Sequence, residues 1–206
     1  MNARSPGLLG AVLCLAACGQ AVAASPAVAV PPSRAVLGID QLADPGFTRY
    51  GALAAATPVE FAGGDTSLAA SLRRDGFSAA ATVRYTRQAD FAVADGPLDV
   101  TASAAAFSTS TGASAAFHQV AGADDDAAGA VAVSTGPLGD EAHADSTVRA
   151  LPNGLEAVQL AVVWRVANML NVLVLRGRSG GTTLADALVL AEAQTANELG
   201  GGSAGS

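Results

Sequence analysis

The segment spanning residues 155–178 constrains the fold more than any other part of the chain. Over residues 158–166 every second side chain is apolar, with Trp164 among them, which is the period of a β-strand with one face in the core. Ala167 and Asn168 predict a tight turn, because asparagine tolerates the left-handed backbone conformation. The sequence therefore predicts an antiparallel hairpin. Its partner strand runs through Val172, Val174 and Leu175.

A membrane-spanning helix is the alternative interpretation of the same segment. Of the 19 residues from Ala157 to Leu175, 15 are apolar. Arg165 lies near the middle, however, where an arginine costs about 2.5 kcal/mol or more in a bilayer. We therefore predict the hairpin.

Shorter strand and helix patterns fill the rest of the chain. Asp65 is suited to cap one helix and Thr182 or Thr183 another, since their side chains accept hydrogen bonds from the free N–H groups of a first turn. In the last helix, apolar and small residues recur at helical spacing at Leu184, Leu188, Ala191 and Thr195. The expected strands cover residues 47–61, 77–87, 97–107 and 141–150 besides the hairpin, and the expected helices cover 64–76, 108–122 and 182–200. This order predicts a single α+β domain, with a mostly antiparallel sheet and about three helices packed on one face.

The N-terminus has the three parts of a secretory signal peptide. These are Arg4, an apolar segment over residues 8–17, and small residues before a cleavage point. The apolar segment is too short for a membrane span, which needs about 20 residues. The sequence Leu-Ala-Ala-Cys at residues 15–18 resembles the lipobox of bacterial lipoproteins. This resemblance implies that Cys18 is acylated, for example with palmitate, and becomes the first residue of the mature protein.

The cysteine content agrees with that interpretation. The chain has two cysteines, Cys14 and Cys18, and Cys14 lies in the segment that cleavage removes. Cys18 then has no partner for a disulfide, so attachment to the membrane is the role that is left. Two or more acyl chains are enough for stable attachment. The alternative is an ordinary cleavable signal with an incidental cysteine.

The chain is therefore expected to have four parts. They are a signal peptide (1–17), the lipidated Cys18 with a Pro/Ala-rich tether (18–37), a single α+β domain (38–199) and a flexible Gly/Ser tail (200–206). The formal net charge is −7, and loss of Arg4 makes it −8. A negative charge of this size argues against binding to nucleic acid or to anionic phospholipid.

A serine motif lies between the hairpin and the last helix. Residues 177–181, GRSGG, match the G-x-S-x-G pattern of a nucleophile elbow. In hydrolases with that elbow an acid and then a histidine follow the serine, but His118 and His143 both precede Ser179. A triad of His143, Asp145 and Ser179 is the alternative, because geometry and not chain order defines a triad. A Gly/Ser-rich loop needs no catalytic explanation, so we expect no catalytic residues and no enzyme activity.

An acidic loop resembles a calcium site. The segment from Asp124 to Thr135 has some of the spacing of an EF-hand loop. Ala128 replaces one ligand, however, and Thr135 replaces the bidentate glutamate. We therefore expect a solvated loop.

A second polar cluster follows. The segment GDEAH at residues 139–143 brings Asp140, Glu141 and His143 close to Asp145 in the sequence. In a strand, Glu141, His143 and Asp145 share one face, where they could bind a metal ion or perform acid–base chemistry. The alternative is the polar, solvent-facing edge of a strand, which we prefer. We expect neither a metal nor a cofactor.

The C-terminal third of the chain resembles a pattern in uncharacterised bacterial lipoproteins and extracytoplasmic sensor-like domains. In that pattern a Gly-Asp-Glu-Ala segment precedes an aromatic-Arg-x-Gly-Asn hairpin and a closing helix. Here the three parts are residues 139–142, the hairpin around Trp164, and residues 187–199, with Ala167 where the pattern has glycine. The extracellular domains of some bacterial receptor kinases have a similar layout but are joined by disulfides, for which this chain lacks the cysteines.

We therefore expect a membrane-anchored extracytoplasmic lipoprotein with a non-catalytic binding or sensor-like domain. Its expected partners are the membrane, through the lipid on Cys18, and either a small molecule, a lipid or an envelope protein. The expected location is the extracytoplasmic side of the cell membrane. A structural or assembly factor of the envelope is one alternative function, and a small serine hydrolase is another.

Overall fold

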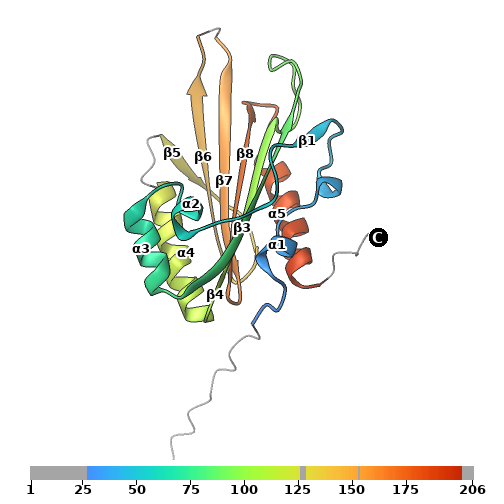
Figure 1. Cartoon of the computed structure of the whole chain (residues 1–206). Coiled ribbons are helices and arrows are strands. Elements are labelled where there is room, and N and C mark those ends of the chain that lie inside the picture. The colour runs from blue at the N-terminus through green and yellow to red at the C-terminus, as the bar shows by residue number, and fades with distance from the viewer. Residues whose placement is uncertain (1–26, 126–128, 153, 201–206) are drawn as a thin grey trace, which may run out of the picture.

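The predicted hairpin forms the centre of one large antiparallel sheet. The computed structural model describes residues 27–125, 129–152 and 154–200. Within these ranges, eight strands pair in the order β1-β3-β4-β8-β7-β6-β5, and β2 pairs with β3 (Figure 1). The strands are β1 (Phe47–Arg49), β2 (Ala54–Ala55), β3 (Phe77–Arg87), β4 (Asp99–Phe107), β5 (Ala130–Val133), β6 (Glu141–Ala150), β7 (Glu156–Val166) and β8 (Met169–Arg178). Since β7 and β8 flank Ala167 and Asn168 in the expected register, the hairpin is confirmed.

The described residues contain five α-helices. They are α1 (Pro32–Ala35), α2 (Pro58–Phe61), α3 (Thr66–Arg74), α4 (Ser110–Asp125) and α5 (Leu184–Glu198). The carboxylate of Asp65 accepts from the first turn of α3, and the hydroxyl of Thr183 caps α5, as expected. The expected strand over residues 47–61 instead divides into β1, β2 and α2, because Pro58 starts a short helix that Thr57 caps.

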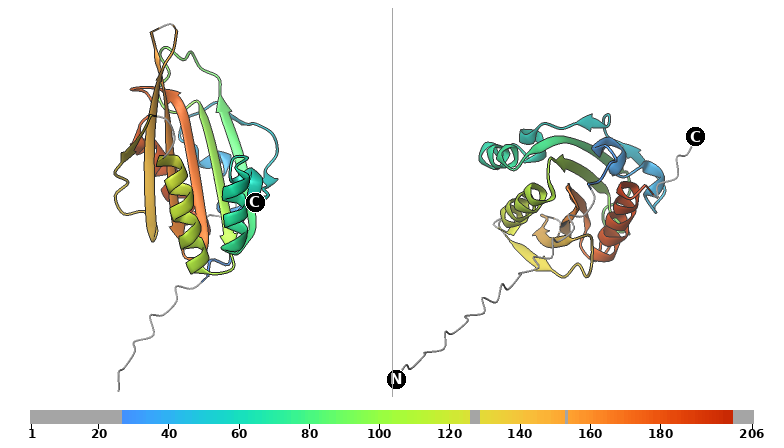
Figure 2. Two further views of the ribbon diagram at one scale, coloured as in Figure 1. Left: turned by 90° about the vertical axis from the view of Figure 1, so that its left-hand side faces the viewer. Right: turned by 90° about the horizontal axis from the view of Figure 1, so that it is seen from below.

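The helices pack on both faces of the sheet, so the prediction of about three helices on one face is wrong. Figures 1 and 2 show α1 and α5 on one side and α2, α3 and α4 on the other. Two separate clusters of buried residues lie beneath them. Val162 and Val163 are consecutive in β7 and both 0 % exposed. Both faces of the central strands are thus covered, which their nearly continuous apolar sequences allow.

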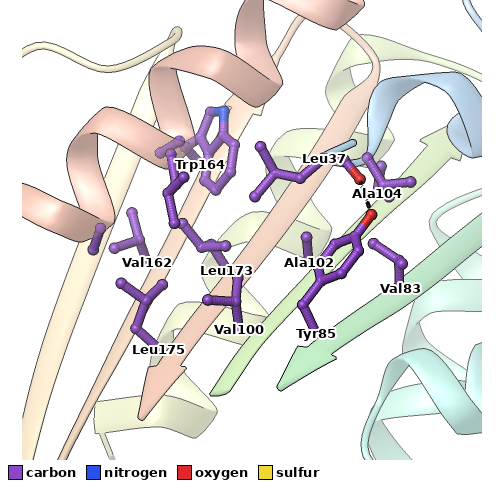
Figure 3. Packing of buried hydrophobic residues seen from close by; sticks show 14 of the residues in the cluster. Leu37, Val83, Tyr85, Val100, Ala102, Ala104, Val162, Trp164, Leu173 and Leu175 are labelled. Atoms are coloured by element: carbon purple, nitrogen blue, oxygen red, sulfur yellow. Dashed lines mark hydrogen bonds between the residues drawn. The ribbon is translucent and has the colours of Figure 1, made fainter. Parts of the chain in front are cut away.

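The larger cluster lies between the sheet and the layer of α1 and α5. Trp164 is 0 % exposed within it, and its indole N–H donates to the Thr195 hydroxyl at 2.9 Å. Figure 3 shows Trp164 beside the aliphatic side chains of the central strands. Trp164 is therefore a core residue, as its position in the alternating pattern predicted.

The folded domain begins before residue 38, within the segment expected to be tether. Pro32 starts α1, and Ala35 and Leu37 are buried in the larger cluster. The Leu37 carbonyl accepts a hydrogen bond of 2.8 Å from the Tyr85 hydroxyl (Figure 3). A proline fits the first turn of a helix, so a Pro/Ala-rich stretch followed by apolar residues can pack. Cys18 and the signal peptide lie outside the described residues, as does the tail after Gly200.

No helix in the described ranges combines the length and the apolar character that crossing a membrane requires. The apolar segment that offered this alternative forms β7 and β8 instead.

Candidate functional site

The GDEA segment leads into β6 and lies against the end of β7. The Asp140 N–H donates to the Arg165 carbonyl at 2.8 Å. Gly139 has φ 61°, and a Cβ there would collide with the same carbonyl oxygen. A side chain at residue 139 would therefore push the segment off β7, which explains the glycine.

Arg165 connects both acidic residues of this segment to the sheet. Its guanidinium donates to Glu141 at 2.8 Å and to Asp140 at 3.0 Å. The Ser114 hydroxyl on α4 also donates to Glu141, at 2.7 Å, and the His118 Nε2 lies 3.3 Å from the other oxygen of that carboxylate. Asp140 and Glu141 are thus compensated by a partly buried arginine, and the cluster ties α4 to β6 and β7.

The turn between β7 and β8 is held by the same cluster. The Ala167 N–H donates to Asp140 at 2.7 Å, and the Ala167 carbonyl accepts from Arg165 at 2.6 Å. The Asn168 side chain donates to the Phe107 carbonyl at 2.9 Å and accepts from the Val28 N–H at 2.7 Å. Ala167, and not Asn168, has the left-handed conformation, with φ 51°. This is the position at which the resembling pattern has glycine.

We expect Ala167→Gly to raise the free energy of unfolding by up to about 1 kcal/mol, because glycine relieves the strain of a positive φ. Ala132→Gly in β5 is the control, since its φ is not positive and its side chain is exposed; it should lower stability by about 0.5–1 kcal/mol. Urea denaturation of both variants measures the difference. Destabilisation by Ala167→Gly equal to that of the control would show that the turn is not strained.

The histidine and carboxylates predicted to share a face of β6 do so, but they do not converge on one point. Glu141, His143 and Asp145 lie opposite alternate residues of β7. His143 Nε2 lies 2.9 Å from Asp145, whereas Glu141 is bonded to Arg165 and Ser114. No group of three metal-ligating side chains occurs among the described residues. The side chains thus belong to two separate polar groups, one around Arg165 and one that contains His143 and Asp145.

The residues of the alternative serine triad are far apart. The Ser179 N–H donates to the Glu156 carbonyl at the start of β7, while His143 lies opposite Val163 near its other end. Seven residues of strand separate the two positions, which is roughly 20 Å. Ser179 is therefore too far from His143 and Asp145 for them to activate it as a nucleophile. Most of the acidic loop between Asp124 and Gly129 lies outside the described residues, so the solvated loop stays a prediction and the calcium alternative stays untested.

A pocket of about 290 Å³ lies beside the turn of the hairpin. Four segments form it: the N-terminal stretch before α1, the loop before β6, the turn itself and the end of α5. Its lining residues are Ala27, Val28, Ala29, Asp140, Val166, Ala167, Glu198 and Leu199. Figure 1 shows the N-terminal segment entering the fold at this end of the sheet. Among the described residues, the two carboxylates are the polar side chains of this lining. We call this the hairpin pocket.

Glu198 is the unusual residue of the hairpin pocket. It is the last residue of α5 and only 3 % exposed. Neither of its carboxylate oxygens has a hydrogen-bond partner in the described structure. The buried Asn171 Nδ2 and Gln194 Oε1 are also unpaired, although Gln194 Nε2 donates to Asn171 Oδ1 at 2.9 Å. Such buried unpaired groups are rare in folded proteins and call for a ligand, a water molecule or a functional role.

Burial raises the pKa of the Glu198 carboxyl to about 8, and the nearby Asn171 amide lowers it by a smaller amount. The amide is thus close enough to favour the charged form, but no hydrogen bond of normal geometry joins the two side chains. A carboxyl with this pKa is largely protonated at neutral pH in the empty protein.

Helical spacing in the sequence places Glu198 on the buried face of α5, but the face predicted above did not include it. The buried face of α5 consists of Ala187, Leu190, Ala191, Gln194 and Glu198. These positions follow helical spacing, but the stripe predicted from Leu184 and Leu188 is rotated from them by about one residue. A glutamine and a glutamate on the apolar face of a helix mark a buried polar site.

A second hollow, of about 210 Å³, lies at the opposite end of α5, against β1. Its walls are apolar apart from Asp186, which accepts hydrogen bonds from the Thr183 N–H and hydroxyl in the helix cap. That carboxylate already has its partners, so the second hollow offers no unpaired polar group to orient a ligand.

Comparison with known proteins finds similar chains among solved structures. No family model matches the chain, and no curated protein matches it. Among solved structures, the extracellular domain of PknH from Mycobacterium tuberculosis is similar to this chain, with a TM-score of 0.44 and 13% sequence identity. The match covers 81% of this chain and 97% of that chain. A similarity of this degree transfers neither a function nor site residues.

Proposed function

We propose that this chain is an exported lipoprotein, anchored to the membrane through Cys18, whose domain binds a small molecule in the hairpin pocket without catalysing a reaction. The observation that carries the proposal is Glu198, a buried carboxylate with no partner at the wall of a pocket. An unpaired buried polar group is costly to a fold. A bound ligand would remove that free-energy cost, because it supplies the missing hydrogen-bond partner.

The separation of His143 from Ser179 supports a domain without a serine triad. The carboxylates of Asp140 and Glu141 support a non-catalytic domain, since both are paired with Arg165. Their role in the proposal is structural: Asp140 holds the turn that forms one wall of the hairpin pocket, and Glu141 holds Arg165.

The proposed anchor would keep the hairpin pocket close to the membrane. Ala27, the first described residue of the pocket wall, is the ninth residue after Cys18, and a chain of that length spans at most about 30 Å. The pocket would therefore take its ligand from the layer of solution next to the bilayer.

We expect Cys18→Ser to release the protein from the membrane, because it removes the atom to which the lipid is attached. Wild-type protein should partition into the detergent phase and incorporate labelled palmitate, whereas the variant should do neither. Cys14→Ser is the control and should behave as the wild type, since Cys14 lies in the segment that cleavage removes. Equal partitioning of all three proteins would contradict the anchor.

Native mass spectrometry of the full chain, purified from membranes in detergent, tests the binding function. A stoichiometric adduct of defined mass that is absent from Glu198→Gln supports a binding protein. A bare mass for both proteins, together with a single envelope protein captured by crosslinking, would contradict it in favour of an assembly factor.

A further inference from the structure

We propose that the hairpin pocket binds a small aliphatic amine in its protonated form, with the ammonium group paired to Glu198. The inference rests on the proposed function and gives the ligand its chemical class. It is drawn from the charges, the unpaired atoms and the walls of the pocket.

The charge of the lining favours a cation. Asp140 and Glu198 are its ionisable residues within the part of the chain that the structure describes, and no described arginine or histidine lines it. Arg165 already compensates Asp140, through a contact of 3.0 Å. Glu198 has no such cation among the described residues. An anionic ligand would find no cation in the described lining, whereas a cationic ligand would stabilise the charged form of Glu198.

The unpaired atoms match the donors of an ammonium group. Within the described lining, the unpaired side-chain atoms are the two oxygens of Glu198, and both are acceptors when the carboxyl is charged. A primary ammonium has three N–H donors and no acceptor. It can therefore donate to both oxygens of the Glu198 carboxylate, and the nearby Asn171 amide remains free to donate to the same group.

The walls of the hairpin pocket fit a short alkyl chain. The other lining residues are alanines, valines and a leucine, from the N-terminal segment, the hairpin turn and the end of α5. A volume of about 290 Å³ lies at the lower end of the range for ligand pockets, so the ligand is small. A metal ion fits less well, because no three ligating side chains of the described residues gather there.

Glu198 is positioned to meet a ligand that enters from the pocket. Both carboxylate oxygens are covered by protein atoms, so contact with a ligand requires this last side chain of α5 to change its rotamer. Glu198 as a whole is only 3 % exposed. The ion pair would therefore form away from solvent, where it is stronger than at a surface.

Isothermal titration calorimetry of the full chain in detergent, with n-butylammonium chloride at pH 8, tests the inference. Wild type should bind the probe, and Glu198→Gln should weaken binding by about 30-fold or more, because it removes one partner of a buried charge pair. Glu192→Gln, an exposed position on the same helix, is the matched control and should bind as the wild type. Sodium butyrate and 1-butanol, which lack the ammonium group, should bind at least about tenfold more weakly.

Absence of butylammonium binding, equal binding by Glu198→Gln, or equal binding of butyrate would each overturn the amine assignment. Native mass spectrometry separates this failure from failure of the proposed function. An adduct that is not an amine leaves a binding protein with a different ligand class. A bare mass with no amine binding rejects both.

Discussion

The stability of the ligand-free wild type, relative to Glu198→Gln, is expected to fall by about 3–4 kcal/mol between pH 5 and pH 8. Burial raises the pKa of Glu198 from 4.5 to about 8 in the folded protein. Between these values the folded state holds a proton that the unfolded state releases. Raising the pH therefore favours unfolding, and the stability that Glu198 contributes below pH 4.5 is lost as the pH rises through 8. Glutamine stays neutral, so the variant lacks this dependence.

Urea denaturation of both proteins at pH 5, 6.5 and 8 measures the effect. The two should differ little at pH 5, and Glu198→Gln should be the more stable protein at pH 8. Glu192→Gln is again the control, and its stability should follow that of the wild type at every pH. Parallel pH profiles for wild type and Glu198→Gln would mean that the carboxyl is paired or solvated in the folded protein.

The Gly139→Ala variant is expected to lose about 2–4 kcal/mol of stability, the second largest effect we predict. The new methyl group would collide with the Arg165 carbonyl oxygen, which is backbone and cannot rotate away. The collision would also break the hydrogen bond of 2.8 Å from the Asp140 N–H to that oxygen. A positive φ of 61° adds backbone strain for any residue with a Cβ.

Gly136→Ala separates the collision from the strain. Gly136 has a similar φ of 66°, but a Cβ there would have no neighbour within 4 Å. Its substitution should therefore cost only about 1–2 kcal/mol, from the backbone alone. Equal losses of stability in thermal or urea denaturation would show that the GDEA segment does not lie tightly against β7.

The sequence predicted the centre of the sheet well because alternation of apolar residues reports a strand directly. The register of β7 and β8 follows from the turn at Ala167 and Asn168. The helix layers were harder to predict, since Val162 and Val163 are both buried and a continuous apolar stretch has no exposed face to count. The alternation of apolar residues in part of β7 therefore suggested one buried face, although helices cover both faces of the sheet.

The candidate site was only partly predictable, because its residues come from distant parts of the chain. The clustering of Asp140 and Glu141 is visible in the sequence, but their pairing with Arg165 depends on the register of β6 and β7. Glu198 was missed because alanines on both faces of α5 blur the buried stripe. The wall formed by Val28 was missed because a Pro/Ala-rich composition suggested a tether.

A pH titration of the Glu198 side-chain carboxyl by ¹³C NMR, assigned with Glu198→Gln, tests the central claim that this group is buried and without a partner at the pocket. The account predicts a midpoint near pH 8 in the empty protein, and a lower midpoint when butylammonium is added, because a cation favours the charged form. A midpoint near 4.5 in the absence of ligand would contradict the account, since the carboxyl would then already have a partner or be in contact with water.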